Sequence, residues 1–343
     1  MNKAAAKNPG KMKITPYDSA RSSMKQITAI FATFAITAAG AAHAQDAYPN
    51  KPVTLIVPFA AGSGTDNVGR IVGQRLSERL KQQVLVDNKP GANGQLAAEM
   101  VAKSKPDGYT LFMTTNTTHS ANPSLYRTLR YDPIKDFTPI IRTGELPFAV
   151  VVNNDLPVKN LKELIDYAKK NPGKLSYATP NSTSLVASET LKNQTRIDIV
   201  GVPYKSSPQA LTDLVGNQIQ LYVVDFGSGM QMLRAQRVRP IAVTPARGSR
   251  ILPNVPPVAA DIPGFDLTSW NGIFGPAGLP AEIVDRLSTE INAVLAEKDV
   301  QEKLAAAGFE VWPSKNPAEF TKYVGDQLVL WTRLIKAANI QPE

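Results

Sequence analysis

Short apolar runs alternate with stretches of helical periodicity along most of the chain. Val53–Val57 is a β-branched and aliphatic run that ends at Pro58, a pattern that predicts a buried strand. Apolar residues then recur three or four positions apart over 68–80, which predicts a helix with Thr65 or Asp66 as its N-cap. The same reasoning predicts strands at 83–87, 110–113, 149–152, 221–224 and 241–243, and helices at 161–169, 209–215, 281–296, 299–307 and 317–338.

This alternation of strand and helix predicts an α/β protein with mostly parallel sheets covered by helices on both faces. In such sheets, ligands bind at the carboxyl ends of the strands. Two polar loops follow predicted strands, one after Val57 and one after Ala178. They are far apart in sequence, so we expect two domains whose strand ends face each other across a cleft.

The N-terminal region has the pattern of an export signal. From Met24 a basic start precedes an apolar run, 27–42, which ends in the small-x-small sequence Ala42-His43-Ala44. We expect cleavage after Ala44, with residues 1–23 an over-extended start. A membrane anchor is the alternative, but the run is short for a bilayer span of roughly 20 residues. The sequence therefore predicts a periplasmic protein.

Composition excludes several classes of function. The chain has no Cys, so it has no disulfide framework and no thiolate metal site. The net charge of +9 falls to about +4 without residues 1–44, and no basic stripe interleaved with aromatics is visible. We expect no nucleic-acid partner, no metal and no cofactor.

The loop 59–66 is the clearest candidate for a binding site. Gly62 and Gly64 allow a tight turn, and the helix that follows directs its positive end at the loop. Backbone N–H groups in this arrangement bind anions such as carboxylates. A dinucleotide fingerprint would need Gly at 67, where the chain has Asn, and a plain strand-to-helix turn remains the alternative.

A second loop, 179–184, is rich in hydroxyl groups and follows the segment 176–178. Its side chains suit a carboxylate or carbonyl group, although ordinary helix capping explains them equally well. The loop 114–118 is similar. After Ala44 the only His is His119, no GxSxG elbow or phosphate-binding loop occurs, and His119 is expected to bond to backbone. The sequence therefore does not favour catalysis.

The order and spacing of several motifs resemble the Bug-type (TctC-like) solute receptors of tripartite tricarboxylate transporters, from about Tyr48 to Glu343. The resemblance is carried by these segments: 48–59, 60–66, 122–126, 131–137, 202–205, 210–214, 263–265, Trp270 and 275–278. It implies a two-lobed periplasmic binding protein of type II, with one lobe formed by 45–147 and 271–343 and the other by 148–270. Segments near 146–150 and 269–275 would be the hinge.

The resemblance also implies which residues contact the ligand. The first-lobe loop would hold a carboxylate, the second lobe would close over it, and the 116–119 loop would line the first-lobe wall. The predicted ligand-binding residues are Phe59, Ala61, Gly62, Gly64, Thr65, Asp66, Asn116, His119, Ser182, Thr183, Ser184, Asp225 and Ser228. Relatives often have His where this chain has Leu185, and Gly where it has Asn181, so the identity of the acid stays open.

We therefore expect a monomeric receptor that captures a small organic carboxylate and delivers it to the membrane components of a tripartite transporter. Two alternatives remain at this point. In one, the closed form contacts a sensor kinase instead of a permease; in the other, the scaffold supports an enzyme, because a fold does not determine a function. The scarcity of His and the absence of Cys count against the enzyme.

Overall fold

The computed structural model describes residues 9–13 and 48–343. The predicted export signal and its cleavage point lie outside these residues. By its internal contacts the chain divides into residues 1–48 and 49–343, and the elements below all belong to the second unit. Within the described residues, no helix is both long enough and apolar enough to cross a membrane.

In the described part of the chain, one sheet has six strands in the order β11-β4-β10-β3-β1-β2. Its strands are β1 (Val53–Val57), β2 (Val84–Asn88), β3 (Thr110–Thr115), β4 (Phe137–Leu146), β10 (Ser269–Pro276) and β11 (Glu310–Val311). Strand β1 pairs in parallel with β2 and β3, whereas β10 runs antiparallel to β3 and β4. This sheet and its helices form what we call the first lobe.

The other sheet, again counted over the described residues, has five strands in the order β7-β6-β8-β5-β9. Its strands are β5 (Phe148–Asn153), β6 (Leu175–Thr179), β7 (Ile199–Pro203), β8 (Leu221–Asp225) and β9 (Val238–Val243). Strand β6 is parallel to β7 and β8, and β5 is antiparallel to β8 and β9. This sheet and its helices form the second lobe.

The predicted α/β class and two-lobed fold are confirmed, but both sheets are mixed rather than mostly parallel. The reason lies in the strands that carry the chain between the lobes. Strand β4 leads into β5 through Pro147 alone, and β9 returns to β10 through residues 244–268. Strands β5 and β10 begin where β8 and β4 finish, with Phe148 opposite Asp225 and Ser269 opposite Leu146, so they run antiparallel to these neighbours. The predicted lobe boundaries, 45–147 with 271–343 and 148–270, stay a prediction.

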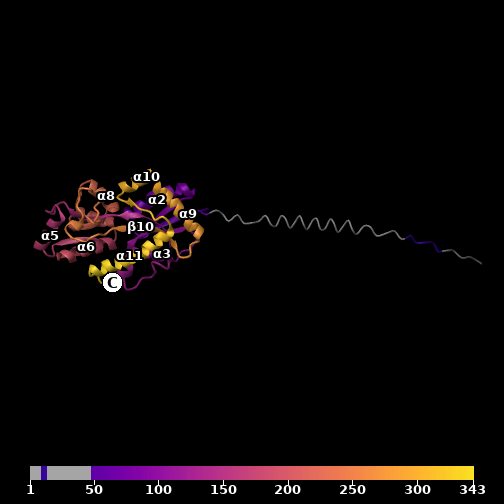
Figure 1. The fold of residues 1–343 in the computed structure, drawn as a ribbon, viewed down its shortest axis with the longest axis horizontal. Helices are drawn as coiled ribbons and strands as arrows, with labels where there is room; N and C mark the ends of the chain where they lie inside the picture. The colour runs from indigo at the N-terminus through magenta and orange to yellow at the C-terminus, as the bar shows by residue number, and fades with distance from the viewer. Residues whose placement is uncertain (1–8, 14–47) are drawn as a thin grey trace, which may run out of the picture. The chain divides into compact units, whose positions relative to one another are not determined.

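Helices cover both sheets. They are α2 (Gly64–Leu80), α3 (Gln95–Ala102), α4 (Asn122–Leu125), α5 (Leu161–Lys170), α6 (Ser182–Thr195), α7 (Ser207–Val215), α8 (Phe226–Arg234), α9 (Ala281–Ala296), α10 (Lys298–Ala306) and α11 (Pro317–Ala337). In Figure 1, α5, α6 and α8 lie to the left of β10 and α2, α3 and α9 lie to its right, whereas α11 runs below β10. The predicted helices at 281–296, 299–307 and 317–338 correspond to α9, α10 and α11.

The first lobe has a core on each face of its sheet, as the alternation of side chains along a strand requires. Leu55 and Val57 face α2, where a Cβ added at Gly69 would lie within 4 Å of both side chains, so glycine lets the helix approach closely. Ile56 points the other way, into a cluster with Phe112 and with residues of α3 and α11. In the second lobe, α7 and α8 pack on one face of the sheet around Val151.

Candidate functional site

The loop after β1 is held in place by the carboxylate of Asp66. The Ser63 hydroxyl caps α2, so the predicted N-cap at Thr65 or Asp66 was wrong by two or three residues. Asp66 instead accepts the backbone N–H of Gly62 at 2.8 Å and an ion pair from Arg70 at 3.0 Å. Asn88 also donates to it, at 2.9 Å. The carboxylate of Asp66 is therefore buried and already bonded to Gly62, Arg70 and Asn88, and these bonds fix the conformation of the loop.

Gly64, the first residue of α2, meets the start of α8 across the two lobes. Its N–H donates to the Ser228 hydroxyl at 3.0 Å, and that hydroxyl donates to Asp225 Oδ2 at 2.9 Å. The other oxygen of Asp225 caps α8 by accepting the N–H of Ser228 at 2.7 Å. Burial raises the pKa of the Asp225 carboxyl above its ordinary value, although the bonds from Ser228 oppose the rise.

A second set of polar contacts joins the lobes at the start of α6. The Asn116 amide donates to the Thr183 hydroxyl at 2.9 Å, and Ser182 donates to Thr117 at 2.8 Å. Asn116 also accepts a bond from Ser269, at the start of β10. These residues are buried, so the predicted residues Asn116, Ser182 and Thr183 are brought together in one interlobe network.

Not every predicted residue faces the other lobe. Ser184 turns into its own lobe and donates to the carbonyl of Val223 at 2.8 Å. Ala61 is exposed on the loop surface. The segment 182–184 is the first turn of α6 rather than a free loop. Its N-cap is Asn181, so the alternative of capping by the Ser and Thr hydroxyls of this loop is wrong.

His119 lies in the aromatic core of the first lobe, not on a ligand-facing wall. Its ring stacks on Phe274 at a centroid distance of 4.0 Å and also contacts Phe112, Phe137 and Trp270. Its Nδ1 bonds to the Thr118 hydroxyl at 2.8 Å, so the expected backbone bond is replaced by a side-chain bond. Burial lowers the pKa of His119 to about 3, so the ring is neutral at physiological pH.

A small cavity of about 30 Å³ lies where these interlobe contacts meet; we call it the central cavity. That volume holds about one water molecule. The starts of α2, α6, α7 and α8 all line it, through Gly64, Thr183, Ser207 and the Asp225 cap. Among its lining residues Asp225 is the only ionisable one, and the rest offer hydroxyl, amide and backbone groups.

A larger groove of about 790 Å³ adjoins the central cavity, and we call it the interlobe groove. Phe59 and Asn181 line both. Its first-lobe wall includes residues 58–60 and 90–94, and its second-lobe wall includes 179–182 and 203–206. Its size is that of ordinary small-molecule sites, which run from about 300 to 1,000 Å³.

Several lining residues are not among the predicted ligand-binding residues: Ser63, Thr115, Thr117, Leu146, Phe148, Asn181, Ser207 and Ser269. All of them except Ser207 lie in the predicted polar loops or hinge segments. The capping signals of Ser63 and Asn181 were visible, because Ser and Asn are preferred N-caps. Leu146 and Phe148 carried no such signal, because in the sequence they look like ordinary core residues. Their place in the cavity follows only from the fold, in which β4 ends and β5 begins on either side of Pro147. Within the described residues, no group of three or more His, Asp or Glu side chains suits a metal ion.

Comparisons with known proteins agree with this geometry. Residues 68–340 match the family model described as "Tripartite tricarboxylate transporter family receptor". The fold is similar to a Rhodopseudomonas palustris protein solved with adipate, with a TM-score of 0.84 and 36% identity, covering 86% of this chain and 100% of the other. It is also similar to the periplasmic binding protein BugD, with a TM-score of 0.81, 32% identity, and coverage of 86% and 100%.

A third solved structure extends the comparison. MatC from Rhodopseudomonas palustris with bound malate has a TM-score of 0.79 and 30% identity, and the match covers 84% of this chain and 100% of that one. Two of the three similar structures thus hold a dicarboxylic acid.

Proposed function

Because the chain belongs to the tripartite tricarboxylate transporter receptor family, we propose that it captures a small organic dicarboxylate between its lobes in the periplasm. The bound form would then deliver the acid to the membrane components of a tripartite transporter. The similar structures with adipate and malate support a dicarboxylate as the class of ligand.

The convergence of helix starts at the central cavity is the observation that carries this proposal. The first N–H groups of a helix have no partner within the helix, and its N-terminus carries a partial positive charge, so such ends bind anions. Four helices begin at this cavity, and no Lys or Arg lines it. A carboxylate held here would be stabilised by neutral donors, which satisfy its lone pairs without a buried counter-charge.

The interlobe bonds indicate how the guest would enter. In this structure the Gly64 N–H is taken by Ser228, and the central cavity is too small for a dicarboxylate. We infer that the lobes rotate apart about the crossing segments 146–150 and 269–275, and that the ligand carboxylate then replaces Ser228 as the acceptor of the Gly64 N–H. The second carboxylate would extend toward the interlobe groove. Closure buries the ligand, as in hinged binding proteins.

The proposed activity is binding without turnover. His119 is neutral, enclosed by aromatic rings and absent from both the cavity and groove linings, so it offers no base to a bound acid. The carboxylate of Asp225 is engaged by the N–H and hydroxyl of Ser228.

A thermal-shift comparison tests the proposal. A ligand that binds only the folded protein raises its melting temperature, by an amount set by concentration relative to Kd. We expect adipate, malate or another dicarboxylate to raise the melting temperature, and the matching neutral diamide to leave it unchanged. A diamide that works as well as its acid, or a panel of acids without effect, would refute carboxylate capture.

A further inference from the structure

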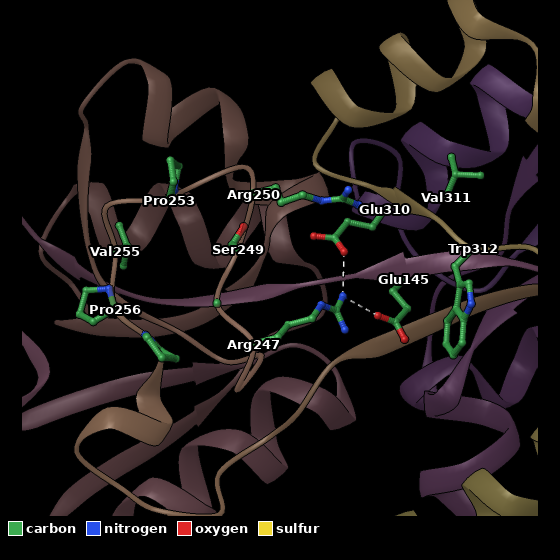
Figure 2. A pocket seen from close by; sticks show the side chains of 12 residues that line it. Glu145, Arg247, Ser249, Arg250, Pro253, Val255, Pro256, Glu310, Val311 and Trp312 are labelled. Atoms are coloured by element: carbon green, nitrogen blue, oxygen red, sulfur yellow. Dashed lines mark hydrogen bonds and ion pairs between the residues drawn. The ribbon is translucent and has the colours of Figure 1, made fainter.

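A second large pocket lies between the lobes, away from the residues described above. It has a volume of about 720 Å³, and we call it the rear pocket. One wall is the loop 247–257, which follows β9 in the second lobe, and the other wall includes Glu145 on β4 and residues 310–312 around β11 in the first lobe. Figure 2 shows these two walls facing each other across the pocket.

Arg247 spans the rear pocket and joins its walls. Its Nη2 lies 3.0 Å from Glu145 Oε2 and 2.7 Å from Glu310 Oε2. Figure 2 shows the guanidinium reaching from the second-lobe loop to both carboxylates. The Glu145 and Glu310 side chains are only 9% and 14% exposed. Without Arg247, two nearly buried carboxylates would face each other unpaired, which is unfavourable.

The strand orders place the rear pocket and the interlobe groove on opposite sides of the crossing strands. The groove lies at the ends of β1, β2, β6 and β7, whereas the rear pocket lies at β4 and β11 and beyond β9. The strands that carry the chain between the lobes, β4 and β10 with β5 and β9, stand between the two. Consecutive residues confirm the division locally: Leu146 lines the central cavity and Glu145 lines the rear pocket.

We propose that the rear pocket changes width in the opposite sense to the ligand cleft: it narrows when the cleft opens, and the ion pairs of Arg247 with Glu145 and Glu310 stabilise the wall spacing of the closed form. This inference rests on the hinge motion in the proposed function. A rotation about strands that lie between two gaps widens one gap as it narrows the other. Arg247 is thus a positioning residue, which sets the balance between open and closed forms without touching the ligand.

The proposal predicts that a bulky side chain in the rear pocket favours the closed form. Pro253 lines this pocket and its exposed neighbour Asn254 does not, so Pro253→Trp and Asn254→Trp form a matched pair. Conversely, Arg247→Gln removes the ion pairs that span the pocket and should favour the open form. A ligand with higher affinity for the closed form then binds more tightly to Pro253→Trp and more weakly to Arg247→Gln.

Spin-label distances across the interlobe groove test this without any ligand. The chain has no Cys, so Pro90→Cys and Lys205→Cys place two unique labels on opposite walls of the groove. In this background we expect Pro253→Trp to shift the distance distribution to shorter values, Arg247→Gln to shift it to longer values, and Asn254→Trp to leave it unchanged. Circular dichroism of each variant checks that it is folded.

Titration with adipate supplies the second readout. We expect Pro253→Trp to lower the Kd by about threefold and Arg247→Gln to raise it by a similar factor. Unchanged distances in folded variants, or a shift to longer values in Pro253→Trp, would overturn the inference. If the distances shift as expected but no acid binds to any variant, the opposite motion of the rear pocket and the interlobe groove is supported and the proposed function is refuted.

Discussion

The backbone N–H of Gly64 donates to the hydroxyl of Ser228 at 3.0 Å, although 164 residues separate them. Gly64 begins α2 in one lobe, and Ser228 lies in the first turn of α8 in the other. This hydrogen bond therefore joins the two lobes at the central cavity, where the N-termini of four helices meet. A guest carboxylate that displaced Ser228 would meet the same N–H group.

Gly64→Ala should prevent this closure. An added Cβ would overlap Asp225 Oδ1 and lie 3.1 Å from Leu146 Cδ1, both on the far side of the interface or at the crossing point. We expect adipate affinity to fall by about tenfold or more, because each 1.4 kcal/mol of lost closure is a factor of ten. Gly325→Ala is the control, since no heavy atom lies within 4 Å of its added Cβ. Equal affinities for both variants would argue against contact at Gly64.

Asp66→Asn should loosen the loop that precedes α2. The carboxylate accepts bonds from Gly62, Arg70 and Asn88, and the variant weakens these charge-assisted bonds. We expect the free energy of unfolding to fall by about 1–3 kcal/mol in urea titrations, together with weaker adipate binding. The control is Asp87→Asn, whose surface pair with Lys89 should change stability by less than about 1 kcal/mol. An Asp66 variant that matches this control would contradict the role of Asp66.

Stability should fall in acid because of His119. Its folded pKa, about 3, lies below the ordinary value of 6.5, so the unfolded chain binds a proton that the folded protein excludes. This part of the stability is complete above pH 6.5 and is lost as pH falls toward 3. At pH 5 the loss is about 2 kcal/mol.

Comparing the pH slopes of the wild type and His119→Phe isolates this effect. The raised pKa of Asp225 acts in the opposite sense, but it is common to both proteins and cancels. The substitution also lowers the free energy of unfolding by repacking the aromatic cluster, but this loss is the same at every pH and does not change the slope. We expect the urea midpoint of the variant to depend less on pH between 4.5 and 7. Identical slopes would mean that folding does not lower the pKa of His119.

Much of the fold follows from the local sequence, but the crossing strands do not. Val53–Val57 and Ala281–Ala296 have clean apolar periodicity and form the expected elements. Strand β4 contains Arg142, Thr143 and Glu145 among its buried residues, so it lacks both the apolar run and the alternation of a typical strand. Strand β10, SWNGIFGP, is likewise interrupted by polar residues and glycine. The buried Arg142 side chain finds its partner far along the chain, where its Nε donates to the carbonyl of Trp312 at 2.9 Å.

The site was predicted in part, for the same physical reason. Gly64 and Thr183 were recognisable because glycine and hydroxyl groups at a strand-to-helix junction have a local meaning. His119 was misplaced because a single imidazole in a polar segment gives no sign that four aromatic rings will enclose it. Whether the predicted residues contact a ligand stays a prediction.

The most direct test of the central claim is isothermal titration of the purified protein with adipate and malate, alongside adipamide and the Gly64→Ala variant. The account predicts saturable binding of at least one of the two acids, no heat of binding with adipamide, and a much weaker signal from the variant. Binding of adipamide as tight as that of adipate, or acid binding that Gly64→Ala leaves unchanged, would contradict carboxylate capture at the converging helix starts.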